Sequence, residues 1–271
     1  MNNILTNFLK NFFILFSLFI ILFFSTNFLI VQSNFEFKIF SLNSFFLFIS
    51  NFFPLETSPE FIILVLKNSW ITISIATVSV FFALIFAIPL SIFISRNLSF
   101  SFNFYTKMKG SAKFFRFFTR FNLVIFRSLP ELIISIFFIR IFGLGEASAI
   151  YAITICYIAF FTKVFTEIIE SSDIKFIHNL MNNSSNKIKI FLFSILPECG
   201  ERFIAYIFFR WECAIRTSII LGIVGAGGVG QQLDLAIKMS ELNEASTILL
   251  FLFVLVMITE FSCKIFIKIL K

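Results

Sequence analysis

The sequence predicts an all-α, polytopic membrane protein with about six transmembrane helices. Of its 271 residues, 59% are hydrophobic and only 14% are charged, and the mean hydropathy is +0.98. A soluble domain has roughly 45–50% apolar residues, and a soluble chain with this surplus would expose apolar patches over much of its surface. The apolar residues also gather into six runs close to the length of about 20 residues that a membrane span needs. The predicted spans are Phe12–Val31, Trp70–Ser95, Asn122–Phe142, Ala147–Phe165, Phe203–Val224 and Ser246–Ile267.

The first apolar run could be confused with a cleaved signal peptide. It is too long for one, and no small-x-small cleavage pattern follows it. We therefore expect it to remain as a membrane anchor. The predicted organisation is an N-terminal transmembrane helix with a periplasmic segment at 1–64 and a larger transmembrane domain at 65–268.

The distribution of Lys and Arg predicts that both termini face the cytoplasm, since basic residues accumulate in cytoplasmic connections. Residues 96–121 contain six basic residues and no acidic one, and residues 163–202 contain five basic residues. The alternate connections, 32–68, 143–146 and 228–245, together hold three basic residues and seven acidic ones. This bias indicates a multi-pass membrane protein. It also explains the net charge of +7 without a nucleic-acid partner.

The two basic connections have different patterns. The first contains phenylalanines at i, i+3, i+4 and i+7 beside a basic face, which predicts a helix lying on anionic membrane lipid. The residues are Phe114, Phe117, Phe118 and Phe121, with Lys113, Arg116 and Arg120. The second connection, 163–202, is long enough to suggest a function. We expect three short polar helices there, at Glu167–Glu170, Ile174–Asn183 and Lys187–Leu196, the last ended by Pro197.

The side chains argue against a membrane-embedded enzyme and predict no cofactor and no metal. His178 is the one histidine, and we interpret it as a surface residue. Four cysteines lie far apart without a C-x-x-C pair, so neither a disulfide framework nor a zinc site is supported. No G-x-x-x-x-G-K-[ST] occurs, so the chain cannot hold ATP phosphates by the usual loop.

Residues 224–232 contain G-x-G-x-x-G, the pattern of a dinucleotide-binding turn. Here the pattern closes a predicted membrane span instead of following a β-strand, so we interpret the match as accidental. The glycines are expected to allow close helix packing, with direct substrate contact as the alternative. They are Gly222, Gly225, Gly227, Gly228 and Gly230.

Several short motifs follow one another in a fixed order. They are Ala87-Ile-Pro-Leu90, Ser95-Arg96-Asn97-Leu98, Arg127-Ser-Leu-Pro-Glu131, Phe142-Gly-Leu-Gly145, Leu196-Pro197, Tyr206, Arg210-Trp211-Glu212, Arg216 and Leu221–Gly230. With these motifs the chain resembles, from about residue 50 to its end, the permease subunits of ABC importers, most closely those of phosphonate and phosphite uptake. The resemblance implies the type I ABC importer transmembrane-domain fold for residues 65–268. It also implies a homodimer, an ABC ATPase subunit that hydrolyses ATP, and a periplasmic substrate-binding protein.

In such importers a cytoplasmic loop with the pattern E-A-A-x-x-x-G-x(9)-I-x-L-P docks into the ATPase. The resemblance places this coupling loop at about 163–202, with most of the pattern's letters replaced. The residues at its positions are His178, Asn179, Leu180, Ser184, Ser194, Leu196 and Pro197. Either a drifting sequence or a co-adapted ATPase explains the replacements.

Charged residues at predicted membrane depth are candidates for a transit path or gate, since such charges usually face a bundle interior or a water-filled path. Arg127 and Glu131 are i, i+4 on the third predicted span and are expected to pair. The planar fork of an arginine suits the oxygens of a phosphonate, so Arg210 and Arg216 could line the path beside Glu212. The alternative is that these residues form interhelical ion pairs that fix the bundle.

A second class of function remains open, an ion-coupled secondary transporter of a small anion. Glu131, Glu212 or Glu260 would then carry the proton. Such transporters often contain inverted repeats, and none is recognisable in these six spans.

Overall fold

The computed structural model describes most of residues 12–28, Phe46, Ser50 and Phe53, and the continuous stretches 55–95, 110–172 and 191–270. The chain divides into two compact units, 1–50 and 51–271. The first unit contains an apolar helix, Leu15–Phe28, within the first predicted span.

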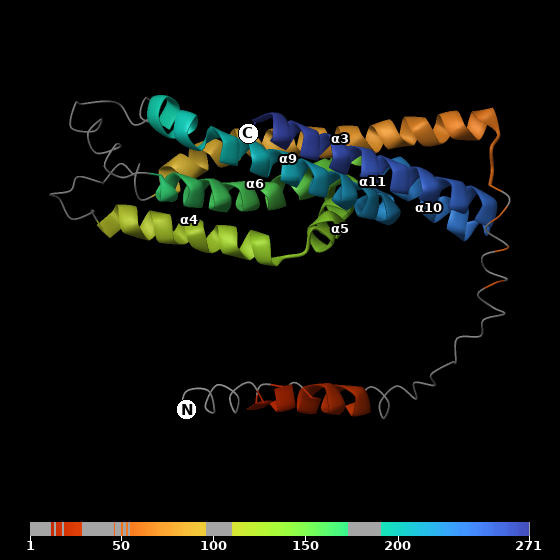
Figure 1. Ribbon diagram of the computed structural model, residues 1–271, viewed down its shortest axis with the longest axis horizontal. Coiled ribbons are helices and arrows are strands. Elements are labelled where there is room, and N and C mark those ends of the chain that lie inside the picture. The colour runs from red at the N-terminus through yellow and green to blue at the C-terminus, as the bar shows by residue number, and fades with distance from the viewer. Residues whose placement is uncertain are drawn as a thin grey trace. The chain divides into compact units, whose positions relative to one another are not determined.

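The second unit is a bundle of helices (Figure 1). Its described residues contain no β-strand. In chain order the elements are α3 Pro59–Ile94, α4 Gly110–Ser128, α5 Glu131–Phe142, α6 Glu146–Ser171, the π-helical turn η1 Phe191–Ile195, α9 Leu196–Leu221, the π-helical turn η2 Gly222–Ala226, α10 Gly228–Lys238 and α11 Leu242–Leu270.

Helix α6 lies at the centre of the bundle and packs against α3, α4, α5 and α9. Its buried face alternates small and large side chains, among them Ala152, Tyr157 and Phe161, none of which is exposed. Alanines of α3, such as Ala76 and Ala83, are also fully buried. Because lipid is as apolar as leucine, membrane helices associate through close packing, which small residues permit. A second apolar cluster joins the start of α3 to α10 and α11.

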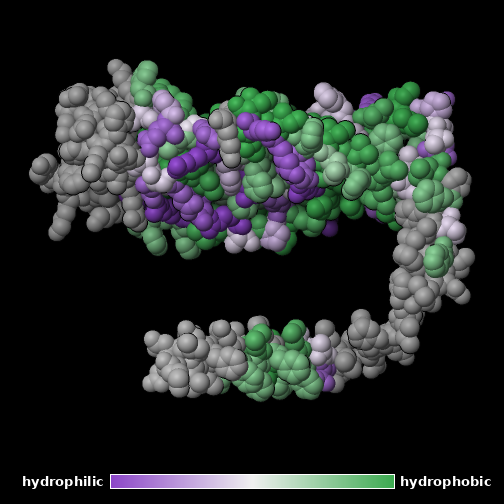
Figure 2. Space-filling view, in the orientation of Figure 1, coloured by the Kyte–Doolittle hydropathy of each residue, from purple (hydrophilic) through white to green (hydrophobic). Residues whose placement is uncertain are grey.

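Large apolar side chains cover the outside of the bundle. Phe81, Phe137, Phe253 and Phe261 are each more than 60% exposed. In the space-filling view, apolar residues cover much of the visible surface, and hydrophilic side chains gather on one part of that face (Figure 2). An exterior of this kind is stable against lipid acyl chains and would be unstable in water.

Three single helices are long and apolar enough to cross a membrane: Pro59–Ile94, Glu146–Ser171 and Leu242–Ile269. Two bent pairs bring the number of candidate spans to as many as five in the described residues. The expected spans at 70–95, 147–165 and 246–267 therefore correspond to single helices, each longer than expected. Helix α3 begins eleven residues before the expected start, where Ser58 and Pro59 provide an extended N-cap and a proline in the first turn.

The expectation of one straight helix over Asn122–Phe142 is wrong. Helix α4 ends at Ser128, α5 begins at Glu131, and the two are bent by 93°. Pro130 explains the break, because the residue before a proline is pushed out of the α region. Pro130 itself is extended, with φ −60° and ψ 135°. Arg127 and Glu131 therefore do not share one helix face.

Helix α4 includes the predicted phenylalanine stretch and orients its two faces differently from the expectation. The side chains of Phe114, Phe117, Phe118 and Phe121 are 55–70% exposed. The basic side turns toward the bundle, where Arg116 Nη2 donates to the Ser95 carbonyl oxygen at 3.4 Å and Arg120 to Glu170 at 2.9 Å.

The long inner loop is shorter than expected. The Glu167–Glu170 segment is not a separate polar helix, because α6 continues to Ser171. Pro197 does not end a helix either. It lies in the first turn of α9, directly after the helical turn η1.

Candidate functional site

Four of the predicted coupling residues, His178, Asn179, Leu180 and Ser184, lie outside the described residues. The two anchoring residues of the pattern, Leu196 and Pro197, form the start of α9. The turn η1 precedes them, and its Phe191 and Ile195 are buried. The end of the long connection is thus fixed to the hydrophobic core.

Arg210 of α9 lies among aromatic rings. Its guanidinium carbon is 3.9 Å from the ring centroid of Phe160 on α6, and its Nε donates to the Tyr206 hydroxyl at 3.0 Å. Tyr157 lies on the same side, with its ring centroid 5.6 Å away. A guanidinium over ring faces is stabilised by the ring quadrupole, more strongly where water is excluded. Within the described chain Arg210 forms no ion pair.

Glu131, in the first turn of α5, lies near the same part of the bundle. Its carboxylate is close enough to act electrostatically on Cys156 and Tyr157 of α6 and on Cys213 of α9. Ser135, one turn further along α5, is fully buried, and its hydroxyl has no hydrogen-bond partner among the described residues. Glu131 and Ser135 thus belong to a helix that packs against both α6 and α9.

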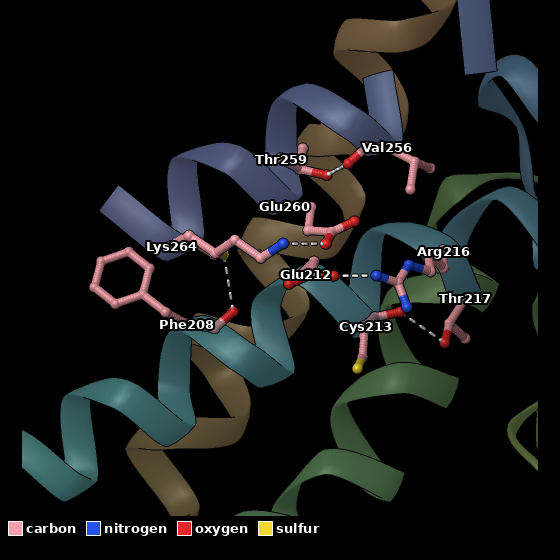
Figure 3. Close-up of polar contacts among 10 residues, drawn as sticks. Phe208, Glu212, Cys213, Arg216, Thr217, Val256, Thr259, Glu260 and Lys264 are labelled. Carbon is pink, nitrogen blue, oxygen red and sulfur yellow. Dashed lines mark hydrogen bonds and ion pairs between the residues drawn. The ribbon is translucent and has the colours of Figure 1, made fainter. Parts of the chain in front are cut away.

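Glu212 and Arg216 lie on a different side of α9 and face α11. They form an i, i+4 ion pair along α9, so the pairing is within one helix instead of between helices. On α11 Lys264 Nζ lies 2.6 Å from Glu260, and Figure 3 shows this pair beside the first one. Arg216 lies six positions after Arg210, so at about 100° per residue the two side chains leave the helix about 120° apart.

Arg127 is separated from Glu131 and lines a cavity of about 220 Å³ between α4 and α6. Four further charged residues line this cavity, and none of them was predicted as a site residue. They are Arg120, Lys163, Glu167 and Glu170. The three residues on α6 have the spacing i, i+4 and i+7, which indicates one helix face. The prediction of a loop from residue 163 onward concealed this pattern.

The glycine cluster forms a tight helix–turn–helix corner. Gly225 and Gly227 have φ of 107° and 91°, a region that residues with a Cβ rarely adopt. A Cβ on Gly222 would lie 2.6 Å from the Gly227 carbonyl oxygen and 2.9 Å from the Gly230 Cα. The corner is tied to its surroundings, since the Gly145 N–H donates to the Gly225 oxygen and the Val229 N–H to Thr72 Oγ1, each at 3.0 Å. These glycines follow a helix, and they close a corner between two helices.

Comparison with protein families gives a match over more than half of the chain. The profile of the family described as "Binding-protein-dependent transport system inner membrane component" matches residues 104–271.

Curated relatives with similar sequences are named as transport permeases. PtxC of Stutzerimonas stutzeri, a phosphite transport system permease protein, is 29% identical over 134 residues, which are 49% of this chain and 49% of PtxC. HtxC of the same organism, named as a candidate phosphite transport system permease, is 29% identical over 198 residues, 73% of this chain and 66% of HtxC. The phosphate-import permease protein PhnE of Mycolicibacterium smegmatis is 30% identical over 138 residues, 51% of this chain and 26% of PhnE. The matched part of the chain thus spans two thirds or less of these relatives.

Solved structures of the MetNI methionine ABC transporter, in inward-facing conformations, contain a chain of similar fold. The TM-score is 0.65 at 20% identity, and the match covers 79% of this chain and 100% of that chain. At this identity the likeness concerns the fold alone. It confirms the predicted fold class, an all-α ABC importer transmembrane domain.

Proposed function

Because the chain belongs to the family of binding-protein-dependent transport system inner membrane components, we propose that it is the permease subunit of an ATP-driven importer of phosphonate, phosphite or a related small phosphorus oxyanion. The observation that carries this proposal is the family match over residues 104–271, together with relatives named for phosphite and phosphate import. The permease works as a homodimer. A separate ABC ATPase hydrolyses ATP, and a periplasmic binding protein delivers the substrate.

The proposed orientation follows from the charge distribution in the sequence. Both termini and the connection between α6 and η1 face the cytoplasm of a bacterium, and the chain spans the inner membrane. The end of the bundle that contains Ile94, Ser171 and Phe191 is then the cytoplasmic end. The coupling loop, with His178, Asn179, Leu180 and Ser184, contacts the ATPase at this end.

Among the charged residues, Arg210 and Glu131 are the best candidates for the transit path. Arg210 is held by aromatic rings and one tyrosine hydroxyl, and no described carboxylate neutralises it. Its charge is therefore available to bind a passing oxyanion. Weak binding of the substrate suits transport, because the substrate must also dissociate. Arg216 is a weaker candidate, since Glu212 already pairs with it.

The test is uptake into proteoliposomes that contain the chain and its ATPase, with the binding protein outside and ATP inside. We expect phosphonate or phosphite accumulation that requires ATP, and roughly tenfold slower uptake for Arg210→Gln, because a charge-assisted contact is lost. Arg140→Gln is the matched control, since Arg140 is exposed at the far end of α5. Uptake that proceeds without ATP and follows a pH gradient would instead establish the ion-coupled transporter.

A further inference from the structure

The cavity between α4 and α6 is lined by two helix stripes. Arg120 and Arg127 come from α4, and Thr162, Lys163, Glu167 and Glu170 come from α6. Figure 1 shows α4 running alongside α6. The volume of about 220 Å³ is far above the ~10–15 Å³ that one water molecule needs. The cavity therefore has room for a polyatomic ligand.

Among the described residues around the cavity, the charges leave one cation in excess. Arg120 pairs with Glu170 at 2.9 Å, and Lys163 Nζ lies 3.5 Å from Glu167. Arg127 also lines the cavity but forms no ion pair with any described residue. An unpaired arginine in a partly enclosed site beside lipid is unfavourable, and an anionic ligand would compensate it.

An unsatisfied hydroxyl gives an independent sign of a missing acceptor. Thr162 lines the cavity and is fully buried, and its Oγ1 has no hydrogen-bond partner in the described part of the chain. Its neighbour Thr166 donates instead to the Thr162 carbonyl oxygen at 2.6 Å. Buried hydroxyl groups nearly always have a partner, so a ligand oxygen in the cavity would satisfy Thr162.

The combination favours a tetrahedral oxyanion. The arginine fork binds two oxygens of a phosphate group, and the threonine hydroxyl donates to a third. The exposed apolar side chains of Phe121 and Val124 lie on α4 beside the cavity and would contact acyl chains. We propose that this cavity binds a phosphate-type oxyanion through Arg127 and Thr162, supplied either by the headgroup of an anionic phospholipid or by a free phosphorus oxyanion.

This site is distinct from the proposed transit path, because neither Arg210 nor Glu131 lines the cavity. The inference therefore stands whether or not the chain transports phosphonate. It requires only that the cavity faces a compartment or a leaflet that contains phosphate groups.

The experiment uses the full-length chain in nanodiscs of two compositions. Phosphatidylglycerol discs supply the lipid source, and phosphatidylcholine discs titrated with inorganic phosphate supply the free anion. The readouts are the thermal midpoint and the phosphatidylglycerol retained in native mass spectrometry. We expect one of the two additions to raise the midpoint, and the variants Arg127→Gln and Thr162→Val to bind roughly tenfold more weakly. Arg140→Gln should behave like the unmodified chain.

The outcomes separate the two sources. If phosphatidylglycerol raises the thermal midpoint and Arg127→Gln removes this increase, the ligand is a lipid headgroup. If inorganic phosphate raises the midpoint in phosphatidylcholine discs, the ligand is a free anion. If neither addition raises the midpoint, or if Arg127→Gln and Arg140→Gln respond equally, the proposal is wrong. Thr162→Val is nearly isosteric, so it decides the question if Arg127→Gln does not insert.

Discussion

Arg210 and Arg216 share one helix, yet their surroundings differ in kind. Arg210 is stabilised by ring faces, a contribution that leaves its charge unneutralised. Arg216 is neutralised by Glu212, whose side chain is only 13% exposed. Removing one member of such a pair leaves the other charge uncompensated and destabilises the protein, whereas removing both can leave the stability nearly unchanged.

This difference gives a prediction for the ion pair on α9. Arg216→Gln should lower the free energy of unfolding by roughly 1–3 kcal/mol, because it strands the Glu212 carboxylate. The double variant Glu212→Gln, Arg216→Gln should recover most of that loss. Thermal unfolding in detergent, arranged as a double-mutant cycle, measures both effects. A double variant as unstable as the single one would show that the charge of Glu212 is not the cause.

A second prediction concerns the corner at the end of α9. Gly230→Ala should destabilise the protein by about 1–3 kcal/mol, because the new Cβ meets the Gly222 Cα at 3.0 Å as well as the carbonyl of Ile219. Gly200→Ala is the control. Nothing lies within 4 Å of a Cβ at that position of α9, and alanine is the better helix former. Equal stability of both variants would contradict the close-packing role of Gly230.

At the scale of elements, the hydropathy pattern predicts which segments become long helices but not where they bend. Helices α3, α6 and α11 coincide with apolar runs, and each extends beyond the predicted span. Helix α3 is extended by a further apolar stretch at 61–66, whereas α6 and α11 are extended mainly by polar residues. The break at Pro130 has a clear local signal, yet a window of about 20 residues averages over it. The cavity residues were missed for a related reason, since Glu167 and Glu170 belong to polar turns of α6.

The bend itself can be tested through Pro130. If the proline causes it, Pro130→Ala should open the 93° angle between α4 and α5, since the segment could then form a continuous helix. Spin labels at the exposed positions Phe118 and Phe137, in a cysteine-free background, should then lie further apart. Pro89→Ala in the continuous helix α3 should leave that distance unchanged. An unchanged distance in Pro130→Ala would mean that packing of α5 on α6 sets the bend.

At the scale of the whole molecule, the fold class could be predicted from the sequence, but contacts between segments far apart in the chain could not. The ordered motifs predicted the fold class, and the likeness to the MetNI chain confirms it. The pairing of Arg120 with Glu170 joins residues fifty positions apart, and no local pattern announces it. The position of Arg210 within a predicted membrane span was enough to make it a candidate. Its aromatic surroundings could not be predicted, because the rings come from both α6 and α9.

The same arrangement suggests how an ATPase would act on the transit path. Helix α6 and the continuous segment of η1 and α9 flank the predicted coupling loop. Both are anchored in the core near it, through Ile169 of α6 and Ile195 of η1. These two helices also supply Phe160 and Arg210. A rigid displacement of the loop would therefore move the residues around Arg210, because packed helices shift as units.

Deleting Asn179–Asn186 tests this coupling. The shortened chain should still insert, since every described helix lies outside the deletion. It should lose copurification with the ATPase and substrate-stimulated ATP hydrolysis in lipid, because the docking segment is gone. A deletion of equal length in the other basic connection, Phe100–Lys107, is the control and should retain both. The opposite result would contradict the prediction: the Asn179–Asn186 deletion would keep copurification and ATP hydrolysis, and the control deletion would lose them. The ATPase contact would then lie at residues 96–109, and α4 would transmit the motion instead of α6 and α9.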